Sequence, residues 1–120
     1  PLDLADLASV TAFCAARVAE PLIDALVLNA GLQDVTGARS VQGLDLTFAA
    51  NHLAHQLILM RLANRIAPGG RILLTSSGTH DPEMKTGMPP PHHADARRLA
   101  RPEADPERDA AAGTAGRRAY

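Results

Sequence analysis

The sequence predicts an α/β protein built on a doubly wound parallel sheet. Two short, largely apolar runs, at residues 22–28 and 71–75, have the length and composition of buried parallel strands. One helical pattern precedes the first run, and a second helical pattern separates the two runs. This alternation of helix and strand is typical of parallel strands that are joined by right-handed crossovers.

The first expected helix begins after Asp6 and ends near Glu20. Asp6 is a suitable N-cap, because its carboxylate can accept hydrogen bonds from the first N–H groups of a helix. Apolar residues then recur at three- and four-residue intervals, namely Leu7, Val10, Cys14 and Val18. The run at residues 22–28 follows, stops at Asn29-Ala30-Gly31, and leads into a polar loop over residues 33–43.

Residues 44–66 form the longest expected helix, because their apolar side chains lie on or near one face. Pro68-Gly69-Gly70 forces this helix to end before the strand at residues 71–75. After Ser77 the chain carries few apolar residues. We therefore expect mostly loop there, with a short helix around residues 94–100.

Composition limits the classes of function. A formal charge of -1 over 120 residues provides no basic surface, so neither nucleic acid nor an anionic membrane is an expected partner. No apolar run approaches the roughly 20 residues of a membrane helix. Cys14 is the single cysteine, which leaves no intrachain disulfide and suits the reducing cytoplasm where we expect the protein.

Small and polar residues follow both expected strands. Asn29, Ala30 and Gly31 end the first strand, and Ser76 and Ser77 end the second. In an open α/β sheet the ligand crevice lies outside the carboxyl ends of the strands, so these positions are candidates for a nucleotide or substrate site. Each motif alone is also an ordinary turn signal, because Asn, Gly and Ser are common where a strand must turn.

Asn51 interrupts a helix rich in Ala and Leu, where its side chain competes for backbone hydrogen bonds. It therefore has either a function or a solvent-facing position. His52 and His55 lie three residues apart on the same helix, and His92 and His93 form a second pair. No carboxylate or cysteine completes a recognisable metal site with them, so we expect no metal and place these histidines at the surface or an interface.

The motifs have a characteristic order along the chain: Leu28-Asn29-Ala30-Gly31, Asn51-His52, Thr75-Ser76-Ser77-Gly78 and Tyr120. In this order they resemble the middle of a short-chain dehydrogenase/reductase, a family of NAD(P)-dependent oxidoreductases. The resemblance implies that residues 1–120 are the central, incomplete part of one Rossmann-type domain. Residues 79–113 are then a long insertion, and Ser77 to Pro82 with the Pro-rich stretch is most similar to the branch related to retinol dehydrogenases and protochlorophyllide reductases.

The resemblance implies a cofactor role for the motifs at the first strand. Asp3 would accept a hydrogen bond from the adenine amino group, although helix capping or plain solvation explains this residue equally well. Asn29, Ala30 and Gly31 would lie beside the adenosine half of NAD or NADP. Leu28 stands where the family usually has another Asn, so any contact of that side chain is lost.

The resemblance also implies three catalytic residues. Asn51 would help to hold a water in a proton relay, and Tyr120 would exchange a proton with the substrate. Ser77 would donate a hydrogen bond to the substrate carbonyl, with Ser76 as the second choice. The segment after Ser77 would flank the substrate cleft, either as a lid or as a surface loop without a role.

The implied reaction is hydride transfer between a nicotinamide and a small carbonyl or alcohol substrate. The glycine-rich dinucleotide loop is expected before Pro1 and a lysine four residues after Tyr120, so the 120-residue piece alone is expected to be inactive. These residues do not encode the choice between NAD and NADP. An alternative from another class is a non-catalytic nucleotide-binding or interaction module with the same fold, and the helix at residues 44–66 offers a surface for a homo-oligomer.

Overall fold

The computed structural model describes the backbone of residues 1–120 and every side chain except those of His80, Pro82 and Ala119. Two parallel strands, β1 (Ile23–Leu28) and β2 (Ile66–Leu74), form the sheet. Helix α1 (Leu7–Arg17) precedes β1, and a helical stretch containing α2 (Leu46–Phe48) and α3 (Ala54–Leu62) connects the two strands. The fold is therefore α/β with the expected order of elements, and its sheet is part of a Rossmann-like arrangement.

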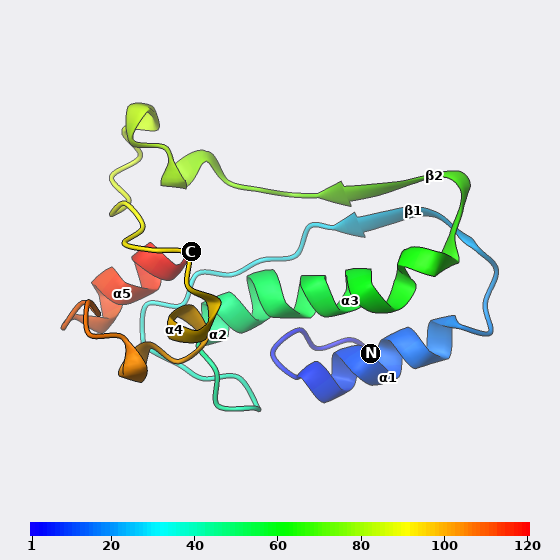
Figure 1. Ribbon diagram of the computed structural model, residues 1–120, viewed down its shortest axis with the longest axis horizontal. Coiled ribbons are helices and arrows are strands. Elements are labelled where there is room, and N and C mark those ends of the chain that lie inside the picture. The colour runs from blue at the N-terminus through cyan, green and yellow to red at the C-terminus, as the bar shows by residue number, and fades with distance from the viewer.

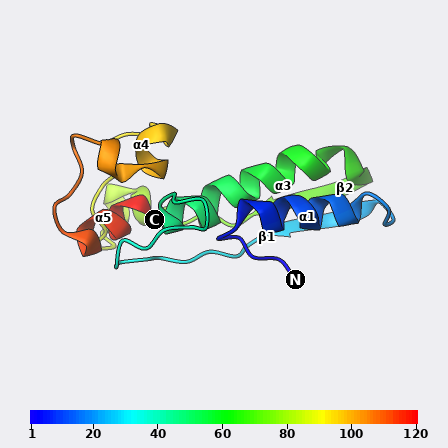
Figure 2. The ribbon, with the colours of Figure 1, turned by 90° about the horizontal axis from the view of Figure 1, so that it is seen from below.

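Both long helices lie on the same side of the sheet, and α1 packs along α3 (Figures 1 and 2). Asp6 caps α1 as expected, because its side chain accepts a hydrogen bond from the N–H of Ala8 at 2.9 Å. The core fills the space between these helices and the sheet, and consists of Val10, Cys14, Leu28, Ala54, Ile58 and Leu62. None of the helices that the structure describes combines the length and apolar character needed to span a bilayer.

The second strand differs from its expected bounds. It begins at Ile66 rather than at Arg71, and the helical stretch ends at Arg65. Ile23 pairs with Ile66 while Ala25 already pairs with Arg71, so the intervening Pro-Gly-Gly segment forms a bulge in β2. Gly70 is required there, because a Cβ atom would lie 2.9 Å from the backbone oxygen of Ile23.

The expectation that both strands are buried is wrong. Val27 and its register partner Leu73 are 58% and 49% exposed. Side chains alternate between the two faces of a strand, and the helices cover only one face of this sheet. The opposite face therefore remains open in the part of the protein that the structure describes.

The helical stretch between the strands is not a regular α-helix. It runs from Leu46 to Arg65, close to the expected 44–66, but residues Ala49–Leu53 form a π-helical turn and Ala63–Arg65 a 3-10 turn. Asp45 caps its start by accepting a hydrogen bond from the N–H of Phe48 at 2.9 Å. The π turn places Asn51 at its centre, which the apolar periodicity did not predict.

The segment after Ser77 folds into short helices at the end of the molecule toward which the strands point (Figure 1). Helix α4 (Ala96–Ala100) confirms the short helix expected near residues 94–100, and Asp95 caps it. Helix α5 (Ala112–Ala119) was not predicted, because two of its eight residues are glycines. It carries Tyr120 at its carboxyl end.

We predict that Ile58→Ala lowers the free energy of unfolding by about 2–5 kcal/mol, since Ile58 is 2% exposed within the core between α3 and the sheet. Met60→Ala on the same helix is the control, and should change stability by less than about 0.5 kcal/mol because Met60 is 73% exposed. Urea denaturation followed by circular dichroism measures both values. Equal losses for the two variants would contradict the assigned core.

Candidate active site

A cavity of about 530 Å³ lies where the two strands end. This volume falls within the range of pockets that hold small-molecule ligands. The carboxyl ends of parallel strands meet at one edge of a sheet, so the motifs that follow β1 and β2 come together here. The lining includes these sequence-predicted residues: Asn29, Ala30, Gly31, Asn51, Ser76, Ser77 and Tyr120.

Asn29 joins the ends of the two strands. The hydroxyl of Thr75 donates a hydrogen bond to Asn29 Oδ1 at 2.7 Å, and the N–H of Thr75 donates to the carbonyl of Leu28 at 3.0 Å. These two bonds fix the loop that follows β1 to the loop that follows β2. The floor of the cavity is therefore a hydrogen-bonded extension of the sheet.

Asn51 holds the loop that follows Gly31. Its Oδ1 accepts a hydrogen bond from the N–H of Leu32 at 2.9 Å, and its Nδ2 donates to the carbonyl of Leu32 at 2.7 Å. The side chain of Asn51 lies beside Gly31, where a Cβ atom would be 3.4 Å from Asn51 Oδ1. The structure thus gives Asn51 a structural reason for its place in the helix, and the proton-relay role stays a prediction.

The π turn around Asn51 is a feature that sequence reasoning missed. Such turns are rare and are found frequently at functional sites. The available signal was the Asn itself, which is unfavourable within a helix unless its side chain has a specific partner. The partner, Leu32, lies 19 residues earlier in the chain, beyond the reach of any local pattern.

Ser77 lies partly buried at the start of the 3-10 turn Gly78–His80. Its hydroxyl accepts a hydrogen bond from the N–H of Thr79 at 3.3 Å and donates to the Thr79 hydroxyl at 3.0 Å. Ser76 is exposed and also lines the cavity. Both serines are therefore within the site, and the choice of Ser77 as the substrate-binding serine stays a prediction.

Tyr120 reaches the cavity because α5 packs on the loop that follows Gly31. Gly116 of α5 lies directly against the backbone of Asp34, and a Cβ atom at this position would be 3.1 Å from Val35 Cα. A hydrogen bond holds Asp34 in turn: its N–H donates to the hydroxyl of the buried Thr47 at 3.0 Å. The helix that carries Asn51 therefore supports the helix that carries Tyr120.

Asp3 does not line the cavity. Its carboxylate accepts a hydrogen bond from the N–H of Ala5 at 2.9 Å, and its own N–H donates to the hydroxyl of Ser9 at 3.1 Å. Asp3 therefore stabilises the turn that precedes α1, and the cap of that helix is Asp6 rather than Asp3. Contact between Asp3 and an adenine amino group remains a prediction.

The segment after Ser77 forms part of the cavity wall. Its contribution consists mainly of apolar residues, namely Met88, Pro89, Pro91, Ala94 and Leu99. Sequence reasoning placed this segment beside the cleft without identifying these side chains. The Pro-rich composition was the only local signal, because the packing depends on contacts distant in the sequence.

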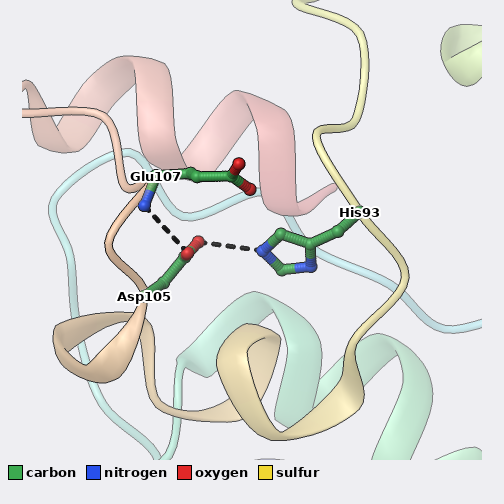
Figure 3. Close-up of side chains that lie close together, drawn as sticks. All are labelled: His93, Asp105 and Glu107. Atoms are coloured by element: carbon green, nitrogen blue, oxygen red, sulfur yellow. Dashed lines mark hydrogen bonds and ion pairs between the residues drawn. The ribbon is translucent and has the colours of Figure 1, made fainter.

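A histidine and two carboxylates lie together beside the cavity (Figure 3). Ligand atoms of His93, Asp105 and Glu107 lie within 4.8 Å of one another, whereas the sequence suggested that no carboxylate joins the histidines. His93 Nε2 lies 2.9 Å from Asp105 Oδ2, and the N–H of Asp95 donates to His93 Nδ1 at 3.2 Å. Because Nδ1 accepts this bond, Nε2 carries the proton and donates it to Asp105.

This hydrogen-bond pattern disfavours a metal at His93. A metal on Nε2 would require the proton to move to Nδ1, where it would face the N–H of Asp95. The guanidinium of Arg98 also lies 3.8 Å from Asp105 and 3.7 Å from Glu107, so a cation already neutralises these carboxylates. The bond from His93 lowers the pKa of Asp105, as expected for a hydrogen bond that favours the ionised form.

His55 does not lie at the surface, which is one of the two places expected for the helical histidines. It is buried in α3 and lines the cavity, whereas His52 is exposed and stacks on Phe48 at 5.0 Å between ring centroids. Burial lowers the pKa of His55, and an interaction with the backbone of Asn51 offsets this only in part. His55 therefore favours the neutral form in the folded protein.

We predict that this burial makes stability depend on pH. The folded-state pKa of His55 lies below the value of about 6.5 for an unfolded chain, so the unfolded state takes up the proton first. Stability should therefore decline as pH falls from about 6.5 toward the lowered pKa, and then level off. Urea denaturation at a series of pH values measures this decline.

His55→Gln should remove this part of the pH dependence. His52→Gln, which removes an exposed histidine from the same helical stretch, is the matched control and should retain it. An unchanged decline in His55→Gln would show that another group causes it.

The chain resembles three groups of curated dehydrogenases and oxidoreductases, although no family model matches it. Retinol dehydrogenase 14 of Homo sapiens is 40% identical over an alignment of 80 residues that covers 63% of this chain and 24% of that protein. The WW domain-containing oxidoreductase of Drosophila melanogaster is 36% identical over 80 residues, covering 66% of this chain and 20% of its own length. Polyprenol dehydrogenase of Danio rerio is 40% identical over 86 residues, and the alignment covers 66% of this chain and 26% of that protein.

A solved structure shares the fold. The crystal structure of an uncharacterized protein from Mycobacterium paratuberculosis matches with a TM-score of 0.58 and 34% sequence identity, over 68% of this chain and 28% of that one. The chain spans about a quarter of the length of the curated relatives it matches. The parallel α/β fold, the ordered motifs around one cavity and these dehydrogenase relatives agree with the resemblance of this chain to the short-chain dehydrogenase/reductase family.

Proposed function

We propose that this chain is the central part of an NAD(P)-dependent oxidoreductase that interconverts a carbonyl and an alcohol by hydride transfer. One observation carries the proposal: a single cavity is lined by the motif after β1, by Asn51, by Ser77 and by Tyr120. The dehydrogenase relatives support the same reaction class. The substrate is then a small molecule that enters between the strand ends and the apolar wall formed after Ser77.

The residues around Gly31 fit a nicotinamide dinucleotide. Ala30 and Gly31 line the cavity with little side chain, so a nucleotide can approach their backbone closely. When bound, the cofactor supplies or accepts the hydride. Asn51 keeps this surface in place through its two bonds to Leu32.

Ser77 and Tyr120 would act on the substrate oxygen. The Ser77 hydroxyl would exchange its bond to Thr79 for one to the substrate, where it stabilises negative charge as that charge develops. The Tyr120 phenol would give up or take the proton. A phenol ordinarily has a pKa near 10, so a nearby cation is needed to favour the phenolate at neutral pH.

We infer that these 120 residues alone bind a dinucleotide weakly and do not turn over. A pyrophosphate is normally held at a helix N-terminus behind a glycine-rich loop, and none of the three expected helices here is preceded by such a loop. Calorimetric titration of the chain with NADH and NADPH tests this inference. Micromolar binding would contradict it.

The proposal is tested with the longest open reading frame that contains this chain. Its product should oxidise NADH or NADPH in the presence of a suitable aldehyde or ketone, and a chelator should leave this rate unchanged. If a chelator abolishes the oxidation of NADH or NADPH and added zinc restores it, the proposal that the reaction needs no metal is wrong. Dinucleotide binding without turnover over a broad carbonyl panel would instead support a non-catalytic nucleotide-binding module.

A further inference from the structure

We propose that Arg118 is a positioning residue that fastens the tyrosine-bearing helix α5 to the segment closing the cavity. Its guanidinium donates to both oxygens of one carboxylate: Nε lies 2.6 Å from Asp109 Oδ2, and Nη2 lies 3.0 Å from Asp109 Oδ1. Its third nitrogen donates to the carbonyl of Pro90. The side chains of Arg118 and Asp109 are 17% and 19% exposed.

The chemistry of this contact favours arginine specifically. A guanidinium presents its donors in a rigid plane, so it can bind a carboxylate with two parallel bonds and a carbonyl with a third. The bond from Arg118 lowers the pKa of Asp109, which keeps the carboxylate ionised. A lysine at this position would keep the charge without the paired geometry.

Arg118 connects two segments that are distant from each other in the sequence. Pro90 belongs to the Pro-rich stretch between β2 and α4, and Asp109 lies in the turn before α5. Pro89, Pro91 and Arg118 all line the cavity together with Tyr120. Fixing Arg118 therefore fixes the distance between the apolar wall and the helix that ends at the tyrosine.

The opposite side of α5 has its own anchor. Gly116 rests on the backbone of Asp34, and Asp34 is bonded to Thr47 of α2. Gly116 and Arg118, which lie four and two residues before Tyr120, thus hold the last turn of α5 from two directions. Without the arginine, the helix end retains one anchor and the phenol gains freedom to leave the cavity.

The chain carries its own reporter for this proposal. Tyr120 is the single tyrosine and tryptophan is absent, so tyrosine fluorescence and its quenching by acrylamide report on this one residue. We expect Arg118→Ala to raise the quenching constant of the 120-residue chain about twofold and to weaken its near-ultraviolet circular dichroism. Arg118→Lys should not restore the native values.

Arg97→Ala is the matched control, because Arg97 is exposed on α4 and its removal makes the same change in charge. It should leave the quenching constant unchanged. Asp109→Asn preserves the shape of the partner but removes its charge, and should shift the constant in the same direction as Arg118→Ala. This variant also tests the contact if Arg118→Ala unfolds the chain, which a thermal melt by far-ultraviolet circular dichroism reveals.

Two results would overturn the proposal. One is a quenching constant that is the same in the native chain, in Arg118→Ala and in Asp109→Asn. The other is a native constant that already equals the value in concentrated urea, because the phenol would then not be held at all.

The role in catalysis rests on the proposed function and is measured separately. In the full reading-frame product, Arg118→Ala and Asp109→Ala should each lower kcat about tenfold or more with little change in dinucleotide affinity. The double variant should lower kcat no more than either single variant does, since Arg118 and Asp109 act through one contact. If the unmodified full-length protein has no oxidoreductase activity but the variants change tyrosine quenching as expected, the proposed function is refuted and the Arg118–Asp109 contact is supported. If Arg118→Ala and Asp109→Ala both keep full activity, the positioning role is refuted.

Discussion

Replacing Gly116 by alanine is expected to lift α5 from the loop that follows Gly31 and to release Tyr120 from the cavity. The backbone carbonyl of Asp34 occupies the space that the new Cβ would need, with Val35 Cα 3.1 Å away. These atoms belong to the backbone and cannot rotate aside, so the whole helix must shift. Overpacking of this kind costs about 1–3 kcal/mol, which exceeds the gain of about 1 kcal/mol that alanine brings to a helix.

Gly113→Ala provides the matched control on the same helix. A Cβ atom at this position would lie 3.8 Å from Arg117 Nη1 and 3.9 Å from the carbonyl of Val35, which are ordinary contacts. This variant should therefore stabilise α5 by up to about 1 kcal/mol through helix propensity alone. Urea denaturation and acrylamide quenching of Tyr120 measure both variants, and a Gly116→Ala chain as stable as Gly113→Ala would contradict the packing of α5.

The sequence predicted the part of the fold that local chemistry determines. The cap at Asp6 and the apolar periodicity after it define α1, and the apolar runs before Asn29 and Ser76 define parallel strands. Parallel pairing then brings the residues after each strand to one edge of the sheet. For this reason motifs far apart in the sequence, such as Asn29 and Ser77, line one cavity.

The remaining features depend on contacts that no local pattern encodes. The π turn at Asn51 is tied to Leu32, and α5 depends on Gly116 meeting Asp34. The early start of β2 at Ile66 requires a bulge that only the pairing with β1 reveals. Strand burial was overestimated because an apolar sequence shows only that a strand can be buried. The elements that pack against the strand determine how much of its surface is buried in the fold.

The wall formed after Ser77 depends on charged pairs rather than on an apolar core. Arg118 with Asp109 and His93 with Asp105 join positions that are nine and twelve residues apart. Such contacts have no periodic signature, and a mixture of acidic and basic residues usually indicates a solvated loop. Their partial burial shows that these pairs pack the segment together, and the choice between a lid and a surface loop without a role stays a prediction.

In the full reading-frame product, Ser77→Ala is expected to lower turnover by about 100- to 1000-fold, equivalent to roughly 3–4 kcal/mol of lost transition-state stabilisation. Ser76→Ala should lower it only a few-fold. Both serines line the cavity, but Ser77 is the partly buried one and its hydroxyl is already oriented by Thr79. A donor held in place before the substrate arrives costs little reorganisation when charge develops on the substrate oxygen.

Ser77 also caps the turn at Gly78–His80, so a loss of turnover has two explanations that a third variant separates. Thr79→Val removes the hydroxyl that accepts from Ser77 but keeps the N–H that bonds to it. If the Ser77 hydroxyl acts on the substrate, Thr79→Val should retain most of the turnover while Ser77→Ala loses it, because the donor survives in the first variant only. Similar losses in both variants would assign Ser77 to the turn, and a larger loss in Ser76→Ala would move the role to that serine.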